Sequence, residues 1–446
     1  MSKKTRLIIL FSCVVCFFVI APILVAYSMG YRLDLEKKEI VGTGGIYVRT
    51  FPPAEQVIVD SKISAKPGIF SNAIFVQSLL AKEHTVFVAK EGYHDYFKTL
   101  SVIEKEVTKL ENVTLFKEDI KFTDIADSVA FFSISPDNNK IIASSTNINP
   151  LTLNYFNIND PLQVQIIPIK ESAAVLDIKW SSNSDYALIK MQDSKEVFYY
   201  LFNNASKIPS TNRLSYLDKN SQQINFNPIN ISELFYVENN TLYILKNNKP
   251  SALIKDLLLY TISENNILWL STDGALKKSD TSGKIMTVLL AENITVSPEV
   301  NYNLIFDSDK IFLDDGDSLS LYNASSKTFT KLNIPKGSFK IIYSPDGKNL
   351  ILWDSSKIYL YSPVSEKYEE LFSGFKITNC QWINNDYIVI TSENSVILSE
   401  IDFRGEINQI TLPMETASPK TFYIGHSGKL YILTNNTLSE SEKLTP

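Results

Sequence analysis

The chain has 446 residues, of which 44% are hydrophobic and 21% are charged, and its formal net charge is −6. This length allows about two or three domains, and the composition excludes wholesale disorder. Proteins that bind bare nucleic acid usually carry an excess of basic residues, so the negative charge argues against a nucleic-acid partner. The 25 Phe and 22 Tyr residues favour β-structure, whereas the 15 Gly residues are few for a chain of this length.

Residues 7–27 carry no charge and follow the basic residues Lys3, Lys4 and Arg6. As a helix, this segment would be roughly 31 Å long, which is enough to cross the hydrocarbon core of a bilayer. The positive-inside rule places the basic cluster in the cytoplasm. We predict a cytoplasmic tip over residues 1–6, a single transmembrane helix over residues 7–27 and an extracytoplasmic remainder of the chain.

A cleaved signal peptide is the alternative interpretation of this segment. Its apolar core would be about 7–15 residues long and would end at an A-x-A-like site. The run here is longer, and Ser28-Met29-Gly30 is a poor cleavage site, so an uncleaved anchor is favoured. Cys13 and Cys16 lie inside the predicted span and leave Cys380 alone outside it, which excludes an intrachain disulfide and a cysteine-ligated zinc site there.

After a predicted linker over residues 28–43, short segments alternate between apolar and polar residues. Such alternation predicts strands with one buried face. These segments are Ile46–Arg49, Val57–Asp60, His84–Lys90, Tyr96–Ile103 and Val107–Leu115. They are separated by the turn residues Pro52-Pro53, Pro67-Gly68 and Glu91-Gly92. We predict a small all-β domain over residues 44–116.

Three segments of this small domain carry a family resemblance. They are Pro52-Pro53-Ala54-Glu55-Gln56-Val57-Ile58-Val59-Asp60-Ser61-Lys62, Ser78-Leu79-Leu80 and Lys90-Glu91-Gly92-Tyr93. They resemble the PEGA domain, a small all-β module of bacterial envelope and surface proteins. The tetrad that names the family is represented in part by Pro53-Ala54-Glu55-Gln56, and Ser61 stands where a turn glycine is usual. The resemblance implies a spacer or ligand-holding module without catalytic residues.

One short pattern recurs through the rest of the chain. An apolar or aromatic residue ends a strand, a polar turn follows, and another β-rich run begins. These marks lie at Ile134, Trp180, Phe226, Ile262, Val296, Tyr343, Trp382 and Ile424. Their mean spacing of about 41 residues matches the period of four-stranded propeller blades. We therefore predict an all-β fold with a β-propeller over residues 117–446. Eight blades are favoured, and seven are possible because two of the spacings are short.

The sixth mark opens a recognisable signature. Tyr343-Ser344-Pro345-Asp346-Gly347-Lys348 is similar to the Trp-Ser-Pro-Asp-Gly-Lys repeat of TolB-like (WD40-like) propellers, and Ile134–Lys140 is a degraded copy. The resemblance implies a closed ring, which leaves no exposed sheet edge at the closure. We expect residues 118–125 to complete the last blade. Trp180 and Trp382 should pack between blades, because aliphatic residues fill the same position in other copies.

The sequence contains no recognised catalytic, cofactor-binding or metal-binding motif. His84, His94 and His426 lack metal-ligand spacing and are expected at the surface or in turns. The acidic run Asp314–Asp317 does not match a calcium loop, so a solvated hairpin turn is expected there. We predict no catalytic residue, no cofactor and no metal, and the sequence leaves the ligand-binding residues open.

These features predict a membrane-anchored, extracytoplasmic binding or scaffold protein. Its propeller would present a surface to a protein, peptide or glycan ligand at the cell envelope. The alternative is a propeller enzyme, a lyase or glycosidase acting on envelope polysaccharide, which would need carboxylates or histidines converging at the central channel. The predicted cytoplasmic tip is too short for a signalling domain, so a sensor would need a partner in the membrane.

Overall fold

The structure is a computed structural model that describes residues 3–34, 38–61, 63–65, 72–205, 208–307, 309–413 and 417–445. Lys62 and the predicted turn Pro67-Gly68 lie outside these ranges. The chain forms two compact units. The first unit comprises residues 1–121, 397–413 and 442–446, and the second comprises residues 122–396 and 414–441.

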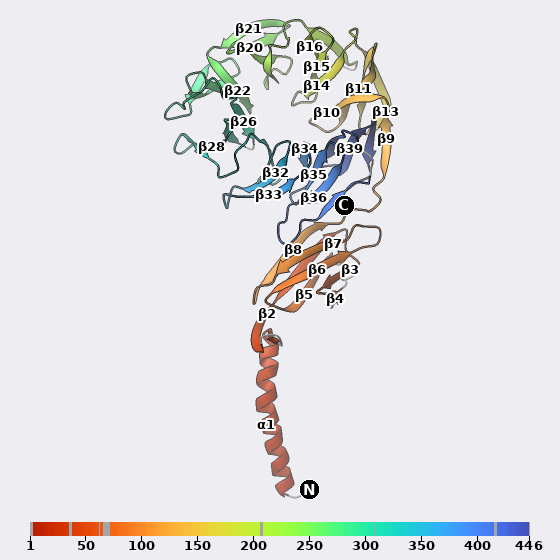
Figure 1. The fold of residues 1–446 in the computed structure, drawn as a ribbon, viewed down its shortest axis with the longest axis vertical. Helices are drawn as coiled ribbons and strands as arrows, with labels where there is room; N and C mark the ends of the chain where they lie inside the picture. Colours follow the sequence, from red (N-terminus) through yellow and green to blue (C-terminus); the bar gives the residue numbers. More distant parts are fainter. Residues whose placement is uncertain are drawn as a thin grey trace. The chain divides into compact units, whose positions relative to one another are not determined.

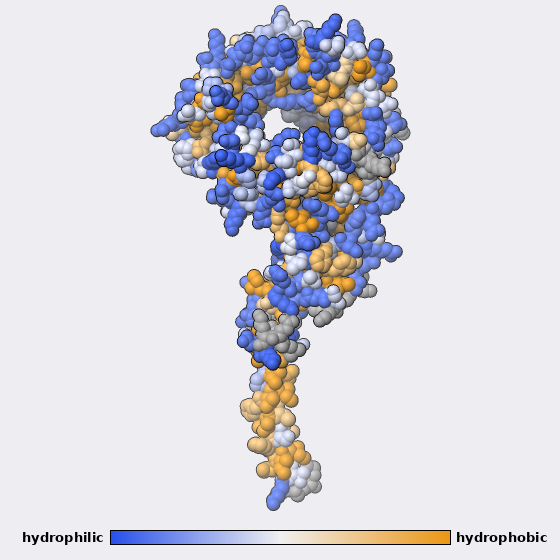
Figure 2. All heavy atoms as spheres, viewed as in Figure 1, coloured by the Kyte–Doolittle hydropathy of each residue, from blue (hydrophilic) through white to orange (hydrophobic). Residues whose placement is uncertain are grey.

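The helix α1 (Lys3–Ser28) contains the predicted membrane span. It is long and apolar enough to cross a membrane, and its large hydrophobic side chains are exposed along its whole length, as the orange column in Figure 2 shows. Pro22 lies inside the helix, where membrane helices tolerate proline better than soluble ones do. The helix extends beyond residues 7–27 because the flanking polar residues continue its hydrogen-bond pattern.

The small β domain consists of two four-stranded sheets around one core. The first sheet contains β1 (Tyr31–Asp34), β2 (Glu39–Phe51), β5 (Ala73–Leu80) and β8 (Val107–Thr114). The second contains β4 (Ile63–Ala65), β3 (Gln56–Val59), β6 (Glu83–Ala89) and β7 (Tyr96–Ser101). Fully buried side chains such as Ile46, Val57 and Leu100 fill the core. Each strand predicted from alternation is present.

The segment predicted as a linker, residues 28–43, is partly strand. β1 pairs antiparallel with the first residues of β2, from Tyr31 opposite Gly42 to Asp34 opposite Glu39. Charged residues interrupt the alternation there, so the sequence pattern gives no strand signal. Pairing in a ladder nevertheless satisfies the backbone donors and acceptors of both segments, and this stabilises a hairpin without a buried face.

Eight further four-stranded sheets follow, and each has its strands in chain order apart from the last. The first two are β10 (Val129–Ile134), β11 (Lys140–Ile148), β12 (Leu151–Asn157), β13 (Asp160–Pro168), and β14 (Ala174–Trp180), β15 (Tyr186–Gln192), β16 (Val197–Asn203), β17 (Ser210–Leu214). The third and fourth are β18 (Gln222–Phe226), β19 (Leu234–Glu238), β20 (Thr241–Lys246), β21 (Lys249–Ile254), and β22 (Leu257–Ser263), β23 (Asn266–Ser271), β24 (Leu276–Asp280), β25 (Ile285–Val288).

The fifth and sixth sheets are β26 (Asn303–Asp307), β27 (Lys310–Asp314), β28 (Leu319–Asn323), β29 (Thr328–Lys331), and β30 (Lys340–Tyr343), β31 (Leu350–Trp353), β32 (Lys357–Ser362), β33 (Lys367–Ser373). The seventh is β34 (Ile377–Trp382), β35 (Tyr387–Ser392), β36 (Val396–Glu400), β37 (Gln409–Thr411), and the eighth is β38 (Lys420–Ile424), β39 (Lys429–Thr434), β40 (Thr437–Ser441), β9 (Phe122–Ala126). The sheets follow one another around a central opening (Figure 1), and Figure 2 shows that side chains leave it unfilled. The described residues thus form a propeller of eight blades.

The ring closes through the eighth sheet. Its outermost strand is β9, which precedes the first blade in the chain and pairs with β40, from Ala126 opposite Leu438 to Phe122 opposite Ser441. A core cluster also joins side chains of the first sheet to Tyr431 and other residues of the last. The prediction that residues just before the first blade complete the last blade is therefore confirmed.

Six of the eight sequence marks are the last residue of the first strand of a blade and Ile262 is the last but one, but the fifth mark is misplaced. Val296 lies in a segment before β26, and that strand ends instead at Phe306-Asp307. Ser297-Pro298 repeats the letters of the signature, but residues 293–297 lie outside any strand. The backbone N–H of Ser297 donates instead to the hydroxyl of Tyr302 at 3.2 Å.

Candidate binding surface of the propeller

A serine follows five of the eight marks, and in three of these copies it forms the same kind of turn. The hydroxyl of Ser344 is buried, accepts the backbone N–H of Asn349 at 3.0 Å and donates to the carboxylate of Asp346 at 2.7 Å. Ser135 and Ser181 form the same pair of bonds in the first and second blades. A serine hydroxyl can donate and accept at once, so each of these residues fixes the turn between the first two strands of its blade.

Side chains of the inner strands also bind backbone of the neighbouring blade. The hydroxyl of Ser133 donates to the carbonyl of Ile178 at 3.2 Å, and the amide of Asn379 donates to that of Thr421 at 3.0 Å. The indole N–H of Trp382 donates to the carbonyl of Ile342 at 3.2 Å. These bonds join consecutive inner strands and fix the lining of the opening.

The two predicted tryptophans pack between blades. Trp180 is half-buried against the core cluster shared by the first and second sheets, and its ring centre lies 6.0 Å from that of Phe202 in an edge-to-face arrangement. Trp382 is likewise half-buried and bonded to the preceding blade. These contacts with the neighbouring blade indicate that both residues support the fold.

Three lysines stand on inner strands, and none of them was singled out from the sequence. The ammonium group of Lys340 lies 4.3 Å from the ring centre of Trp353, and that of Lys420 lies 4.4 Å from the ring centre of Phe131. Desolvation lowers the pKa of Lys179 and of Lys420, although solvent reaches both side chains. This combination indicates a concave surface, where protein surrounds a group without covering it.

A cavity of about 430 Å³ lies between the second and third blades. Asp177, Lys179, Lys190 and Tyr199 line it from the second blade, and Lys219 and residues 221–224 line it on the side of the third. Only the register of the sheets brings these residues together, because Lys190 lies directly opposite both Asp177 and Tyr199. No local motif in the sequence marks this cavity.

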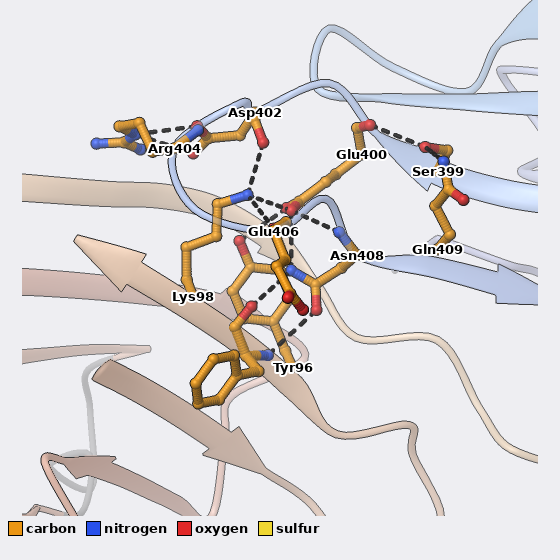
Figure 3. A network of polar contacts seen from close by, with 10 residues as sticks. Tyr96, Lys98, Ser399, Glu400, Asp402, Arg404, Glu406, Asn408 and Gln409 are labelled. Carbon is orange, nitrogen blue, oxygen red and sulfur yellow. Dashed lines mark hydrogen bonds and ion pairs between the residues drawn. The ribbon is translucent and has the colours of Figure 1, made fainter. Parts of the chain in front are cut away.

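The first unit contains a buried ion pair, shown in Figure 3. Lys98 on β7 is fully buried, and its ammonium group contacts the carboxylate of Glu400 and donates to the carbonyls of Asp402 and Glu406 at 2.6 and 3.0 Å. Tyr96 donates to the same carboxylate at 2.8 Å. Every donor of the ammonium group is thus satisfied, which is the condition under which a buried charge is tolerated.

The hairpin around Glu400 is held to β7 by neutral hydrogen bonds as well. Asn408 exchanges bonds with the backbone of Phe97, accepting its N–H at 3.1 Å and donating to its carbonyl at 2.8 Å, and its side chain also donates to Glu400. Gly405 adopts a φ of +66°, and a Cβ there would meet the backbone of Thr99. The network is therefore structural in character.

The histidines differ from the sequence expectation in one case. His84 lies in a strand, as the alternation predicts, but it is buried there and not at the surface, with Nδ1 2.6 Å from the carboxylate of Asp60 and Nε2 2.8 Å from the carbonyl of Leu80. It belongs to the buried face of its strand, which also carries Val86 and Val88. His94 is half-buried, and His426 is exposed in a blade turn.

The acidic run is a turn, as expected, but its first residue is not solvated. Asp314 is buried and accepts the N–H of Gly316 at 2.8 Å and the hydroxyl of Ser338. Asp315 accepts the N–H groups of Asp317 and Ser318 within the turn.

Burial raises the pKa of the thiol of Cys380. Across the described ranges, no group of three or more His, Cys, Asp or Glu residues is placed to hold a metal ion.

No family model and no curated protein matches this chain. Solved structures do match it. The Dos1 propeller aligns with a TM-score of 0.50 and 11% identity, over 73% of this chain and 95% of that chain. BamB from Moraxella catarrhalis aligns with a TM-score of 0.45 and 9% identity, over 72% of this chain and all of that chain. At such low identity the first likeness shows the fold alone: this chain contains a β-propeller.

Proposed function

We propose that this protein is a membrane-anchored binding or scaffold protein whose propeller presents a ligand surface at the cell envelope, outside the cytoplasm. The observation that carries the proposal is the order of parts along the chain: an apolar helix, a small β domain and a closed ring of eight blades. An apolar helix of this kind is either an anchor or a signal sequence. The uninterrupted length of α1 and the basic residues before it favour an anchor with its N-terminus in the cytoplasm.

The small β domain fits the role of a PEGA-like spacer. Its two sheets enclose a core of aliphatic side chains. Lys98, which is fully buried on β7, uses its ammonium group in three hydrogen bonds. The TolB-like serine turns give the propeller a rigid frame. The inner strands add amides and ammonium groups that suit a polar ligand, such as a glycan or a polar segment of a protein.

The test is an affinity capture with immobilised residues 32–446 against solubilised envelope material. Specific retention of a glycan or protein, competed by the free fragment, supports the proposal. Retained material that is shortened on incubation would favour the enzymatic alternative, a lyase or glycosidase. Recovery of the native protein in the cytoplasmic fraction, with no membrane association, would contradict the proposal.

A further inference from the structure

Three strands of the second blade place a cation, an anion and a phenol on one face. Lys190 on β15 lies directly opposite Asp177 on β14 and Tyr199 on β16, and directly opposed side chains share a face of the sheet. Lys179 and Lys219 complete the charged lining of the cavity of about 430 Å³ between the second and third blades. This cavity therefore carries three ammonium groups and one carboxylate.

The positive charges of the cavity are not neutralised by ion pairs within the described part of the chain. Lys179 donates to the carbonyl of Ile224 at 2.8 Å and to the amide oxygen of Asn225, both of which are neutral. Lys190 and Lys219 have neither a hydrogen bond nor an ion pair there. A local excess of cations in a chain of net charge −6 indicates a site that attracts an anion.

The acidic groups nearby offset only part of this excess. The carboxylate of Asp177 accepts the N–H of Ile178, its chain neighbour, at 2.9 Å. Asp218 lies beside Lys219, but both of its oxygens accept hydrogen bonds from Asn220. Neither carboxylate forms an ion pair with a lysine of the cavity, and the three ammonium groups outnumber the two carboxylates, with Lys190 and Lys219 left without a partner among the described residues.

Tyr199 adds a neutral hydrogen-bond donor to the cavity. Its side chain is only 4% exposed and lines the cavity, yet its hydroxyl has no hydrogen-bond partner among the described residues. Desolvation raises the pKa of Tyr199, and the charges of Asp218 and Asp177 raise it further, so the phenol keeps its proton. The hydroxyl of Tyr343 is buried without a partner in the described part of the chain, whereas that of Tyr199 is accessible from the cavity and is placed to donate to a ligand oxygen.

We propose that this cavity binds a sugar that carries a carboxylate, of the uronic acid type. Lys190 and Lys219 hold the carboxylate, and the hydroxyl of Tyr199 donates to a ring or hydroxyl oxygen. The exposed amide of Gln222 hydrogen-bonds the sugar hydroxyls. The volume lies within the usual range of small-ligand sites. An acidic peptide would also match the lysines, and the experiment below separates it from the sugar. This inference rests on the proposed binding function and names its ligand class.

The experiment measures binding of tetragalacturonate to the full-length chain in nonionic detergent by titration calorimetry, with its neutral methyl ester as the comparison probe. We expect the acid to bind more tightly than the ester, with an affinity that falls as salt is added. Lys190→Gln and Lys219→Gln should each weaken binding about tenfold, because each removes a charge-assisted hydrogen bond. Tyr199→Phe should weaken it a few-fold, and Lys249→Gln on the outer strand β21 should have no effect.

Melting curves of each variant establish that it is folded. Equal affinity for acid and ester, or unchanged binding in folded Lys190→Gln and Lys219→Gln, would overturn the inference. Binding of hexaglutamate in place of tetragalacturonate, with the same dependence on the variants, would assign the cavity to an acidic peptide and also overturn it. If these titrations fail while residues 32–446 still capture an envelope ligand, the proposed function stands and only its assignment to an acidic sugar falls.

Discussion

Lys98 and Glu400 show how a charged residue is accommodated in a core. The ammonium group reaches one carboxylate and two carbonyls, and the carboxylate also accepts bonds from Tyr96 and Asn408 (Figure 3). Such a pair contributes little net stability compared with apolar residues of the same shape. Its effect is to specify one arrangement, because any other would leave a buried charge unpaired.

Replacing Lys98 with Met should therefore destabilise the protein by about 3–5 kcal/mol, since the carboxylate of Glu400 would remain buried without a counter-charge. The double variant Lys98→Met/Glu400→Gln should recover much of this loss. Urea unfolding of residues 32–446 measures both. Lys117→Met, which breaks an exposed pair with Glu442, is the control and should change stability little. Wild-type stability of Lys98→Met would show that the ion pair is not formed.

The stability of the small β domain depends on pH through the carboxyl group of Asp60. Desolvation alone would raise the pKa of Asp60, but hydrogen bonds from His84 and from the N–H of Thr85 outweigh it and hold that pKa below its usual value. A carboxyl group whose pKa is lower in the folded state stabilises the fold above its unfolded pKa of about 3.9. That contribution is lost as the pH falls through the folded pKa.

Asp60→Asn should consequently be less stable than the wild type at pH 7, and the difference should shrink below about pH 4. The measurement is the free energy of unfolding of both proteins at pH 7 and pH 3. Asp119→Asn, at an exposed carboxylate, is the matched control. A difference that stays constant across this range would mean that Asp60 does not form its folded-state bonds.

At the scale of elements, two kinds of hydrogen bond recur in the blades. A buried serine fixes the first turn of a blade, as Ser344 does, and inner-strand side chains such as Asn379 bind the neighbouring blade. The pairing of β9 with β40 occurs once and joins the two ends of the propeller in one sheet. Closure removes the free edges that an open row of blades would expose.

Truncation tests this closure. Removing residues 421–446 deletes β38–β40 almost entirely and leaves β9 without its partner strand, so the fragment should aggregate or lose its cooperative melting transition. The milder variant Leu438→Ala removes a fully buried side chain at the junction and should cost about 2–5 kcal/mol. Light scattering measures aggregation of the truncated fragment, and calorimetry measures the melting transition of both variants. A truncated fragment that stays monomeric with an unchanged melting temperature would contradict a closed ring.

At the scale of the whole molecule, the proposal depends on α1 being retained as an anchor. The basic residues Lys3, Lys4 and Arg6 precede an apolar run, which favours an N-terminus in the cytoplasm. We expect the native protein to keep its N-terminus and to lose its propeller when intact cells are treated with protease. Intact mass and N-terminal sequencing check the first point, and protease shaving checks the second. A mature N-terminus near Tyr31 would identify α1 as a cleaved signal sequence.

The sequence by itself determined the features that are periodic or local. An uncharged run marks α1, alternation marks the strands of the small β domain, and a signature spaced at the blade period marks the propeller, because each depends only on neighbouring residues. The fifth mark was misplaced at Val296 because it rested on a short sequence motif alone, and Ser297-Pro298 matches that motif outside a blade turn.

Tertiary structure alone decided what depends on pairing between distant segments. β9 joins the last blade, and His84 is buried because Asp60, 24 residues away, supplies a carboxylate. The cavity between the second and third blades exists because sheet register sets Lys190 opposite Asp177 and Tyr199. Register is a property of paired strands and leaves no trace in a single segment, so the sequence defines the propeller and only the fold reveals its candidate site.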